Sequence, residues 1–139
     1  MLDHTDLKII QELTHNSRMT MKELGDKVHL TGQAAATRVA KLEEQGVVEG
    51  YTVKVNKKKI GYAVHAFITV MTQSTSHHPY LNFVETQTKH VENHYKISGE
   101  GCYMLECRFV SHEQLDQFLV DLNRHANYKL SIVINHQSK

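Results

Sequence analysis

The residues with the clearest chemical potential lie at positions 32–41, GQAAATRVAK. The first of them have short or amide side chains: Gly32, Gln33, Ala34 and Ala36. Hydrogen-bonding and cationic residues follow on the outer side that a helix would give them: Thr37, Arg38 and Lys41. Short side chains allow close approach to DNA, while glutamine can pair with adenine and arginine with guanine or phosphate. This set predicts a helix that reads base edges; the alternative is an ordinary amphipathic helix with a polar outer face.

A group of lysines follows this helix and could hold DNA phosphates. Its members are Lys54, Lys57, Lys58 and Lys59. A charged wing beside a recognition helix positions a protein on the DNA backbone without reading sequence. Each phosphate contact would add roughly 0.9 to the slope of log affinity against log salt. The lysines therefore favour DNA binding over the plain amphipathic helix.

The turn Gly99-Glu100-Gly101 permits two interpretations. Two glycines can serve a tight hairpin between strands, because glycine adopts positive φ without steric cost. They can also let backbone N–H groups approach a ligand closely. The residues alone favour the hairpin.

Other reactive residue types do not form a recognisable catalytic set. Eleven histidines make chance clusters expected, so the adjacent pair His77-His78 is interpreted as solvated rather than metal-binding. Cys102 and Cys107 have neither the count nor the spacing of a disulfide framework or zinc site. Nucleophile–base–acid sets, phosphate-loop glycines and H-E-x-x-H are missing from the sequence. We expect no catalytic residue, no metal and no cofactor, and a reducing cytosol as the compartment.

Two helix-start signals position the proposed recognition helix. Thr20 and Glu23 form a T-x-x-E capping box, and Thr31 is a second N-cap candidate. Apolar residues recur at helical spacing after each signal: Leu24 and Val28, then Ala35, Val39 and Leu42. An earlier helix begins at Asp3 and Asp6, whose negative charges suit its positive end. Three helices with a tight turn predict a helix-turn-helix.

The remaining chain predicts a strand and then a second domain. Tyr51, Val53 and Val55 alternate with polar residues, as in a half-buried strand. From residue 62 the expected order is a strand at 62–71 buried on both faces, a helix from Ser76-His77-His78-Pro79 with Leu81 and Val84 inward, a strand at 91–97, a strand at 103–109, a helix through 115–122 and a strand at 129–135. This β-α-β-β-α-β order is that of a ferredoxin-like sandwich.

The fold class is therefore α+β, with three regions. Residues 1–50 form the helix-turn-helix, 51–61 the wing strand and linker, and 62–139 the ferredoxin-like domain. The net charge of +1 is a weak argument against an indiscriminate nucleic-acid binder, but the first 61 residues hold ten Lys/Arg against eight Asp/Glu. Any DNA contact should thus lie in the first half. The sequence contains no apolar run that could span a bilayer, so we expect no membrane partner.

Five segments in this order and spacing resemble the Lrp/AsnC family of bacterial and archaeal transcription regulators. They are LDHTDLKIIQEL, NSRMTMKELGDKVHLT, TRVAKLEEQGVVEGYTVKVN, KIGY and KISGEGCYMLECRF. The resemblance implies DNA binding through a winged helix-turn-helix, homodimers paired by their sheets and assembly into tetramers, octamers or larger rings. It places double-stranded-DNA contacts at Thr31, Gln33, Thr37, Arg38 and Lys41. It places an amino-acid effector loop at Gly99, Glu100, Gly101, Cys102 and Tyr103.

Three residues depart from the family pattern. His29 stands at the usual turn glycine, and histidine tolerates positive φ better than most residues, so we expect the turn to survive. Ala35 replaces a branched apolar residue and leaves a smaller plug between helices. Cys102 replaces a common aspartate, and a thiol cannot neutralise an ammonium group as a carboxylate does. This argues against a standard amino-acid response.

The leading hypothesis is a sequence-specific transcription regulator acting in the cytoplasm, associated with the nucleoid. An architectural protein that wraps DNA with little sequence preference is one alternative. Another is an enzyme, since some haem-biosynthesis decarboxylases resemble this family in both domains. The basic wing and polar helix face argue against the enzyme.

Overall fold

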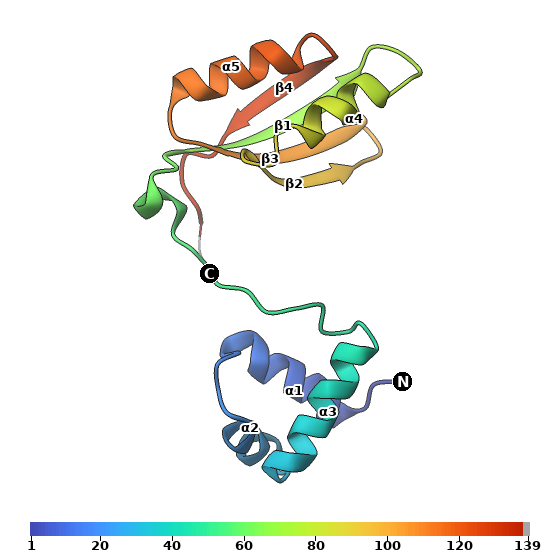
Figure 1. Ribbon diagram of the computed structural model, residues 1–139, viewed down its shortest axis with the longest axis vertical. Helices are drawn as coiled ribbons and strands as arrows, with labels where there is room; N and C mark the ends of the chain where they lie inside the picture. Colours follow the sequence, from blue (N-terminus) through green and yellow to red (C-terminus); the bar gives the residue numbers. More distant parts are fainter. Residues whose placement is uncertain (138–139) are drawn as a thin grey trace. The chain divides into compact units, whose positions relative to one another are not determined.

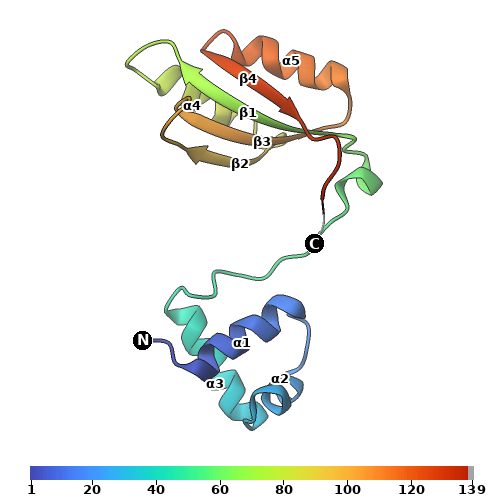
Figure 2. The same cartoon turned by 180° about the vertical axis from the view of Figure 1, so that it is seen from behind.

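A computed structural model describes residues 1–137 of the chain (Figures 1 and 2). The described chain divides into two compact units, one spanning Met1–Lys54 and the other beginning at Val55. Each unit has its own hydrophobic core. Among residues 1–137, no helix has the length and apolar character needed to cross a membrane.

The first unit contains three helices, as the sequence predicted. They are α1 (His4–His15), α2 (Met21–Val28) and α3 (Gly32–Glu44). Their apolar stripes meet in one core, made of Ile9, Leu13, Met19, Leu24, Val28, Ala35, Val39 and Leu42. Ala35 is fully buried, so the small plug expected at this position is part of the packed interface.

Side-chain caps define where these helices begin. Thr20 Oγ1 accepts from the Glu23 N–H at 3.1 Å, and Glu23 Oε1 accepts from the Thr20 N–H at 3.1 Å. The predicted capping box is therefore present, and an equivalent box joins Asp3 to Asp6 at the start of α1. Each box satisfies two backbone donors that a helix start would otherwise leave unpaired.

The turn between α2 and α3 depends on two unusual backbone positions. His29 adopts the left-handed conformation, with φ of 62°, so the expected survival of this turn is confirmed. The N–H groups of His29 and Leu30 both donate to the Gly25 carbonyl, the latter at 2.8 Å. A Cβ added to Gly25 would lie 2.5 Å from the Leu30 carbonyl oxygen. Only glycine therefore lets the chain fold back across α2 so closely.

The predicted wing strand at 51–55 is wrong. Residues 51–56 have no regular secondary structure, and Val53 is 75% exposed. The basic turn that follows is a short 3-10 helix, η1 (Lys57–Ile60). Alternating apolar residues bury one face only when a neighbouring strand supplies a sheet. Within the described chain, the first unit supplies only helices.

The second unit has the predicted β-α-β-β-α-β order. Its elements are β1 (Val64–Thr72), α4 (His78–Glu85), β2 (Val91–Lys96), β3 (Tyr103–Phe109), α5 (His112–Leu122) and β4 (Ala126–Ile132). The strands form one antiparallel sheet in the order β2-β3-β1-β4. Both helices cover the same face, leaving the other face open (Figures 1 and 2).

Two details of this unit differ from expectation. β1 is central, but only alternate residues are buried and the others are half-buried, because the helices cover one face of the sheet. β4 begins at Ala126 rather than at residue 129, and Leu130 and Ile132 remain 38% and 40% exposed. An edge strand has a partner on one side only, so its apolar residues are less well covered.

The inward face of α4 also differs from its prediction. Val84 is buried as expected, whereas Leu81 is only half-buried. Tyr80 and Phe83 instead complete the buried face of the helix. By contrast, all four predicted inward residues of α5 are buried: Leu115, Phe118, Leu119 and Leu122.

Replacing Gly25 should destabilise the first unit. We expect Gly25→Ala to lower its free energy of unfolding by about 1–3 kcal/mol, the usual cost of overpacking. Gly50→Ala is the matched control, because no atom lies within 4 Å of its added Cβ. Native-state hydrogen exchange of core amides in α1–α3 measures both variants. Equal stability of the two variants would show that the turn relaxes without cost.

Candidate DNA interface and effector loop

Three predicted DNA contacts lie on the solvent side of α3. Gln33, Thr37 and Lys41 are all exposed. They are spaced four residues apart, so they follow one another along one side of the helix. The Thr37 hydroxyl donates to the Gln33 carbonyl at 3.1 Å, which fixes its orientation while leaving its oxygen free to accept. This stripe presents an amide, a hydroxyl and an ammonium group together.

The beginning of α3 combines capping with close helix packing. Thr31 Oγ1 accepts from the Ala34 N–H at 3.1 Å, confirming Thr31 as the N-cap. A Cβ on Gly32 would lie 3.2 Å from the Lys22 Cα, so this glycine allows α2 and α3 to approach. Ala34 and Ala36 are half-buried. The small residues therefore serve the helix junction as well as the predicted approach to a groove.

Arg38 makes an ion-pair network that the sequence did not predict. Its Nη1 lies 2.7 Å from Asp3 Oδ2 and 3.2 Å from Asp6 Oδ1. The hydrogen bond from Arg38 lowers the pKa of the Asp3 carboxyl and, with the bond to Asp6, raises the pKa of Arg38. The guanidinium thus joins the middle of α3 to the start of α1. Arg38, which the sequence predicted to face outward toward a base or a phosphate, is therefore paired with carboxylates of the first unit.

The sequence signal for this network was incomplete. Asp3 and Asp6 were interpreted only as charges that suit the helix dipole. Arg38 lies 35 residues from Asp3, and the pairing requires α1 and α3 to pack first. Periodicity could have placed the three side chains near the same helix interface but could not have paired them.

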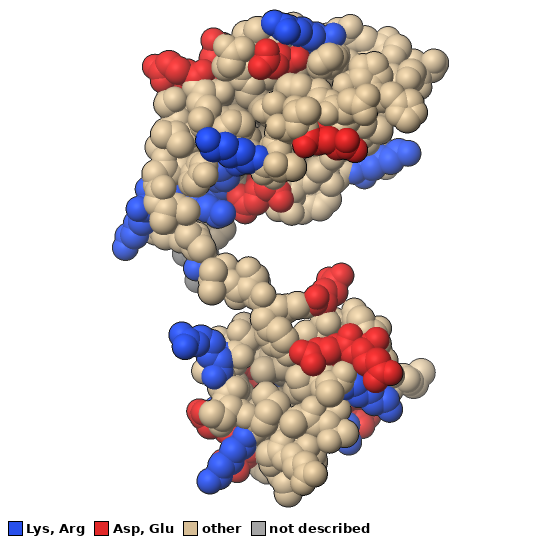
Figure 3. Space-filling view, viewed as in Figure 1, with Lys and Arg blue, Asp and Glu red and all other residues tan. Residues whose placement is uncertain are grey.

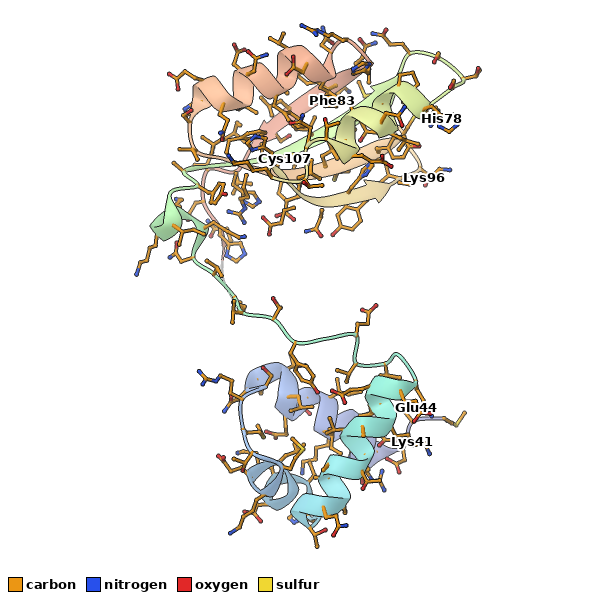
Figure 4. The ribbon with its side chains drawn as sticks, viewed as in Figure 1. Lys41, Glu44, His78, Phe83, Lys96 and Cys107 are labelled. Atoms are coloured by element: carbon orange, nitrogen blue, oxygen red, sulfur yellow. The ribbon has the colours of Figure 1, made fainter. Side chains whose placement is uncertain are left out.

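The predicted phosphate-binding lysines divide between the two units. Lys54 is exposed in the first unit, near its end. The next three lysines lie in η1, where Lys58 and Lys59 are exposed and Lys57 is half-buried. Asn56 Oδ1 accepts from the Lys59 N–H at 3.3 Å and caps this short helix. Lys41 and Glu44, labelled in Figure 4, lie near the end of α3 together with Glu43.

The Gly99-Glu100-Gly101 turn is part of the hairpin between β2 and β3. Gly99 and Gly101 have φ of 101° and 96°, so both need the freedom of glycine. A Cβ on Gly101 would lie 2.7 Å from the Thr69 Cγ2, because the turn crosses closely over β1. The Cys102 N–H donates to the Val70 carbonyl at 2.7 Å. The favoured hairpin interpretation is confirmed, and the turn is firmly anchored.

The two cysteines occupy opposite environments. Cys102 is half-buried, and its Sγ lies 3.5 Å from the Thr72 hydroxyl. Hydrogen bonding to Thr72 lowers the pKa of the Cys102 thiol, with a smaller contribution from Lys96. Burial raises the pKa of Cys107 to about 12. Of the two thiols, Cys102 is therefore the more acidic and the one beside the turn.

The other residues of the predicted effector loop point in different directions. The Tyr103 side chain is buried, and its hydroxyl lies 2.9 Å from His77 Nδ1. Glu100 is exposed, with Oε2 3.5 Å from Lys129 Nζ. The structure thus groups Glu100, Gly101 and Cys102 at the turn and places the Tyr103 ring inside the core.

The adjacent histidines have separate roles in the fold. His77 bonds to Tyr103, whereas His78 begins α4 and is exposed (Figure 4). Over residues 1–137, His, Cys, Asp and Glu side chains form no group of three placed to hold a metal ion. A similar bond joins the hydroxyl of the buried Tyr80 to Nε2 of the exposed His94 at 3.0 Å.

Comparisons with known proteins match both units of the chain. Residues 2–49 match a family model described as winged helix-turn-helix DNA-binding, and residues 65–138 match the Lrp/AsnC ligand binding domain. HTH-type transcriptional regulator LrpA of Bacillus subtilis (strain 168) is 56% identical over 134 residues, which cover 96% of this chain and 98% of that protein.

Solved structures agree over nearly the whole length. Bacillus subtilis LrpC aligns with a TM-score of 0.92 at 30% identity, covering 99% of this chain and 98% of its own. The feast or famine regulatory protein of M. tuberculosis, complexed with L-methionine, aligns with a TM-score of 0.92 at 27% identity, covering 100% and 96%. The helix-turn-helix, the β-α-β-β-α-β unit and these matches together show that this chain belongs to the Lrp/AsnC family of transcriptional regulators.

Proposed function

We propose that this regulator binds specific double-stranded DNA by placing the start of α3 in the major groove. The observation that carries this proposal is the exposed stripe of Gln33, Thr37 and Lys41 on a helix whose start is capped by Thr31. An amide can read a base edge, and an ammonium group can hold a phosphate. Lys54, Lys57 and Lys58 add backbone contacts. The relatives' names as HTH-type transcriptional regulators support this assignment.

The same features support a regulator rather than an enzyme. Relatives across the full length are named transcriptional regulators. We infer that the chain acts in the cytoplasm, at the nucleoid, as a homodimer that assembles into a tetramer or octamer. The open sheet face provides a surface for pairing, because Phe67 and Met104 lie on it half-buried beside the polar side chains of His65 and Glu106. Analytical ultracentrifugation of the full chain tests the assembly.

We propose that the turn at Gly99–Cys102 contacts an amino-acid effector. Two structurally similar regulators have been solved with methionine, one from M. tuberculosis and one from Neisseria meningitidis. In this chain the turn backbone is fixed by Val70, the Glu100 carboxylate lies beside Lys129, and the position of the common aspartate holds the Cys102 thiol. A thiol provides less negative charge for an ammonium group than a carboxylate does, so amino acids should bind weakly.

The α3 stripe gives the first functional prediction. Binding-site selection with the purified protein identifies an operator. We then expect Gln33→Ala to weaken operator binding by about 1–3 kcal/mol and to relax the preference at one base position. Lys41→Gln should weaken binding to all DNA sequences alike and reduce the slope of log affinity against log salt by about 0.9. Lys96→Gln is the control, because it removes a positive charge from an exposed position of β2, outside the first unit. Salt-controlled mobility shifts measure all three, and an unchanged affinity for Gln33→Ala would exclude its role.

Arg38 tests whether a cation in α3 reads DNA or positions the helix. If its pairing with Asp3 and Asp6 sets the orientation of α3, Arg38→Ala and the double variant Asp3→Asn/Asp6→Asn should weaken operator binding to a similar extent. Base preferences should then stay unchanged at every position. A direct base contact instead predicts a roughly tenfold or larger loss for Arg38→Ala alone, with relaxed preference at one base. Quantitative binding-site selection with each variant distinguishes these outcomes.

Restoring a carboxylate beside the turn tests the effector proposal. We expect Cys102→Asp to bind a responsive amino acid at least about tenfold more tightly than the native chain, because a charge-assisted hydrogen bond replaces a thiol contact. Cys102→Ser keeps the side chain small and neutral and should resemble the native protein. Calorimetric titration with a panel of amino acids measures the affinities. Tight binding by the native chain, or equal weak binding by all three, would contradict the role given to this position.

A further inference from the structure

A small basic cavity lies in the second unit, away from the Gly99–Cys102 turn. It has a volume of about 150 Å³ and lies among η1, the connection from α4 to β2, and the end of β3. Its lining residues are Lys57, Tyr62, Thr88, Lys89, His90, Val91, Glu92 and Arg108. Blue side chains gather around η1 in the space-filling view (Figure 3). All the lining residues belong to one unit, so the cavity does not depend on how the units are arranged.

The charges around this cavity are unequal. Lys57, Lys89 and Arg108 contribute three positive charges, and Glu92 contributes the single negative charge. Arg108 Nε donates to Glu92 Oε2 at 2.9 Å. Among the described residues, that is the only side-chain hydrogen bond of Arg108, so its two terminal nitrogens are available to another acceptor. The cavity therefore keeps an excess of two positive charges.

His90 lies in the wall of the cavity, with its ring packed against the core. Its Nδ1 is the one buried side-chain nitrogen or oxygen without a hydrogen-bond partner among residues 1–137. The ring is held in place by stacking on Phe109, with centroids 5.0 Å apart, and by an edge contact with Phe118. The backbone of His90 is already paired with Gln87 and Arg108. Because Nδ1 has almost no solvent-accessible area, it is packed within the cavity wall and does not itself face the cavity.

We propose that this cavity binds a small phosphoryl dianion, either inorganic phosphate or the phosphate group of a metabolite. A dianion matches the two unbalanced positive charges. The terminal N–H groups of Arg108 have the planar geometry that pairs with two phosphate oxygens, and the lysines supply point charges. The volume is sufficient for a tetrahedral oxyanion but not for a large ligand.

Titration of the full chain with inorganic phosphate, at constant ionic strength maintained by chloride, tests this proposal. Calorimetry and the backbone amide NMR signals of residues 88–92 should show saturable binding. Lys89→Gln and Arg108→Gln each remove one of the three cations that line the cavity. Each should weaken phosphate binding by roughly tenfold, the usual effect of losing a charge-assisted hydrogen bond. Arg124→Gln removes an equal charge elsewhere in the same unit and should leave the affinity unchanged.

Three results would overturn the proposal. They are no saturable binding by the native chain, an equal loss for Arg124→Gln, and unchanged binding in both cavity variants. A DNA phosphate in the same place is the other source of this chemistry. In that case Lys89→Gln would reduce the salt slope of DNA binding by about 0.9 while free phosphate fails to bind. Binding of free phosphate, together with an unchanged salt slope of DNA binding in Lys89→Gln, would support the small-molecule site.

Discussion

The crossing of α2 and α3 depends on how closely the chain passes Gly25. Because this residue has no side chain, the Leu30 carbonyl can lie where a Cβ would otherwise be. His29 then accepts a left-handed backbone so that two successive N–H groups donate to the Gly25 carbonyl. The position of Thr31, and hence the first residue of α3, follows from this turn. Every proposed base contact on α3 is therefore set by a backbone contact within α2.

Local signals predicted most of the fold. Capping boxes, helical periodicity and the glycine turn identified all three helices of the first unit and the order of elements in the second. These signals act over four or fewer residues, so the sequence contains them directly. The prediction of a strand at 51–55 was wrong because strand pairing requires a neighbouring strand, which the first unit does not provide. The pairing of Arg38 with Asp3 could not be predicted from local signals either, since it forms only after helices that are distant in sequence pack together.

The effector region shows the same division between backbone and side chains. The glycines at 99 and 101 could be assigned to a hairpin because positive φ demands them. Which way each neighbouring side chain points depends on the register of β1 and β3, which places Tyr103 opposite Val70 in the core. The cavity near η1 combines residues from three separate elements, so it could not be predicted from residue spacing along the chain. Composition identified the DNA-binding half but not the basic site in the other half.

The exposed segment between α3 and η1 has a consequence for binding strength. Residues 51–56 form neither helix nor strand, and six extended residues reach at most about 20 Å. In a homodimer, such a tether keeps each helix-turn-helix close to its partner once the other has found its half-site. The second contact then occurs at an effective concentration that tether length sets, on the order of millimolar for short flexible linkers. Lengthening this segment would alter avidity while leaving every protein–DNA contact in place.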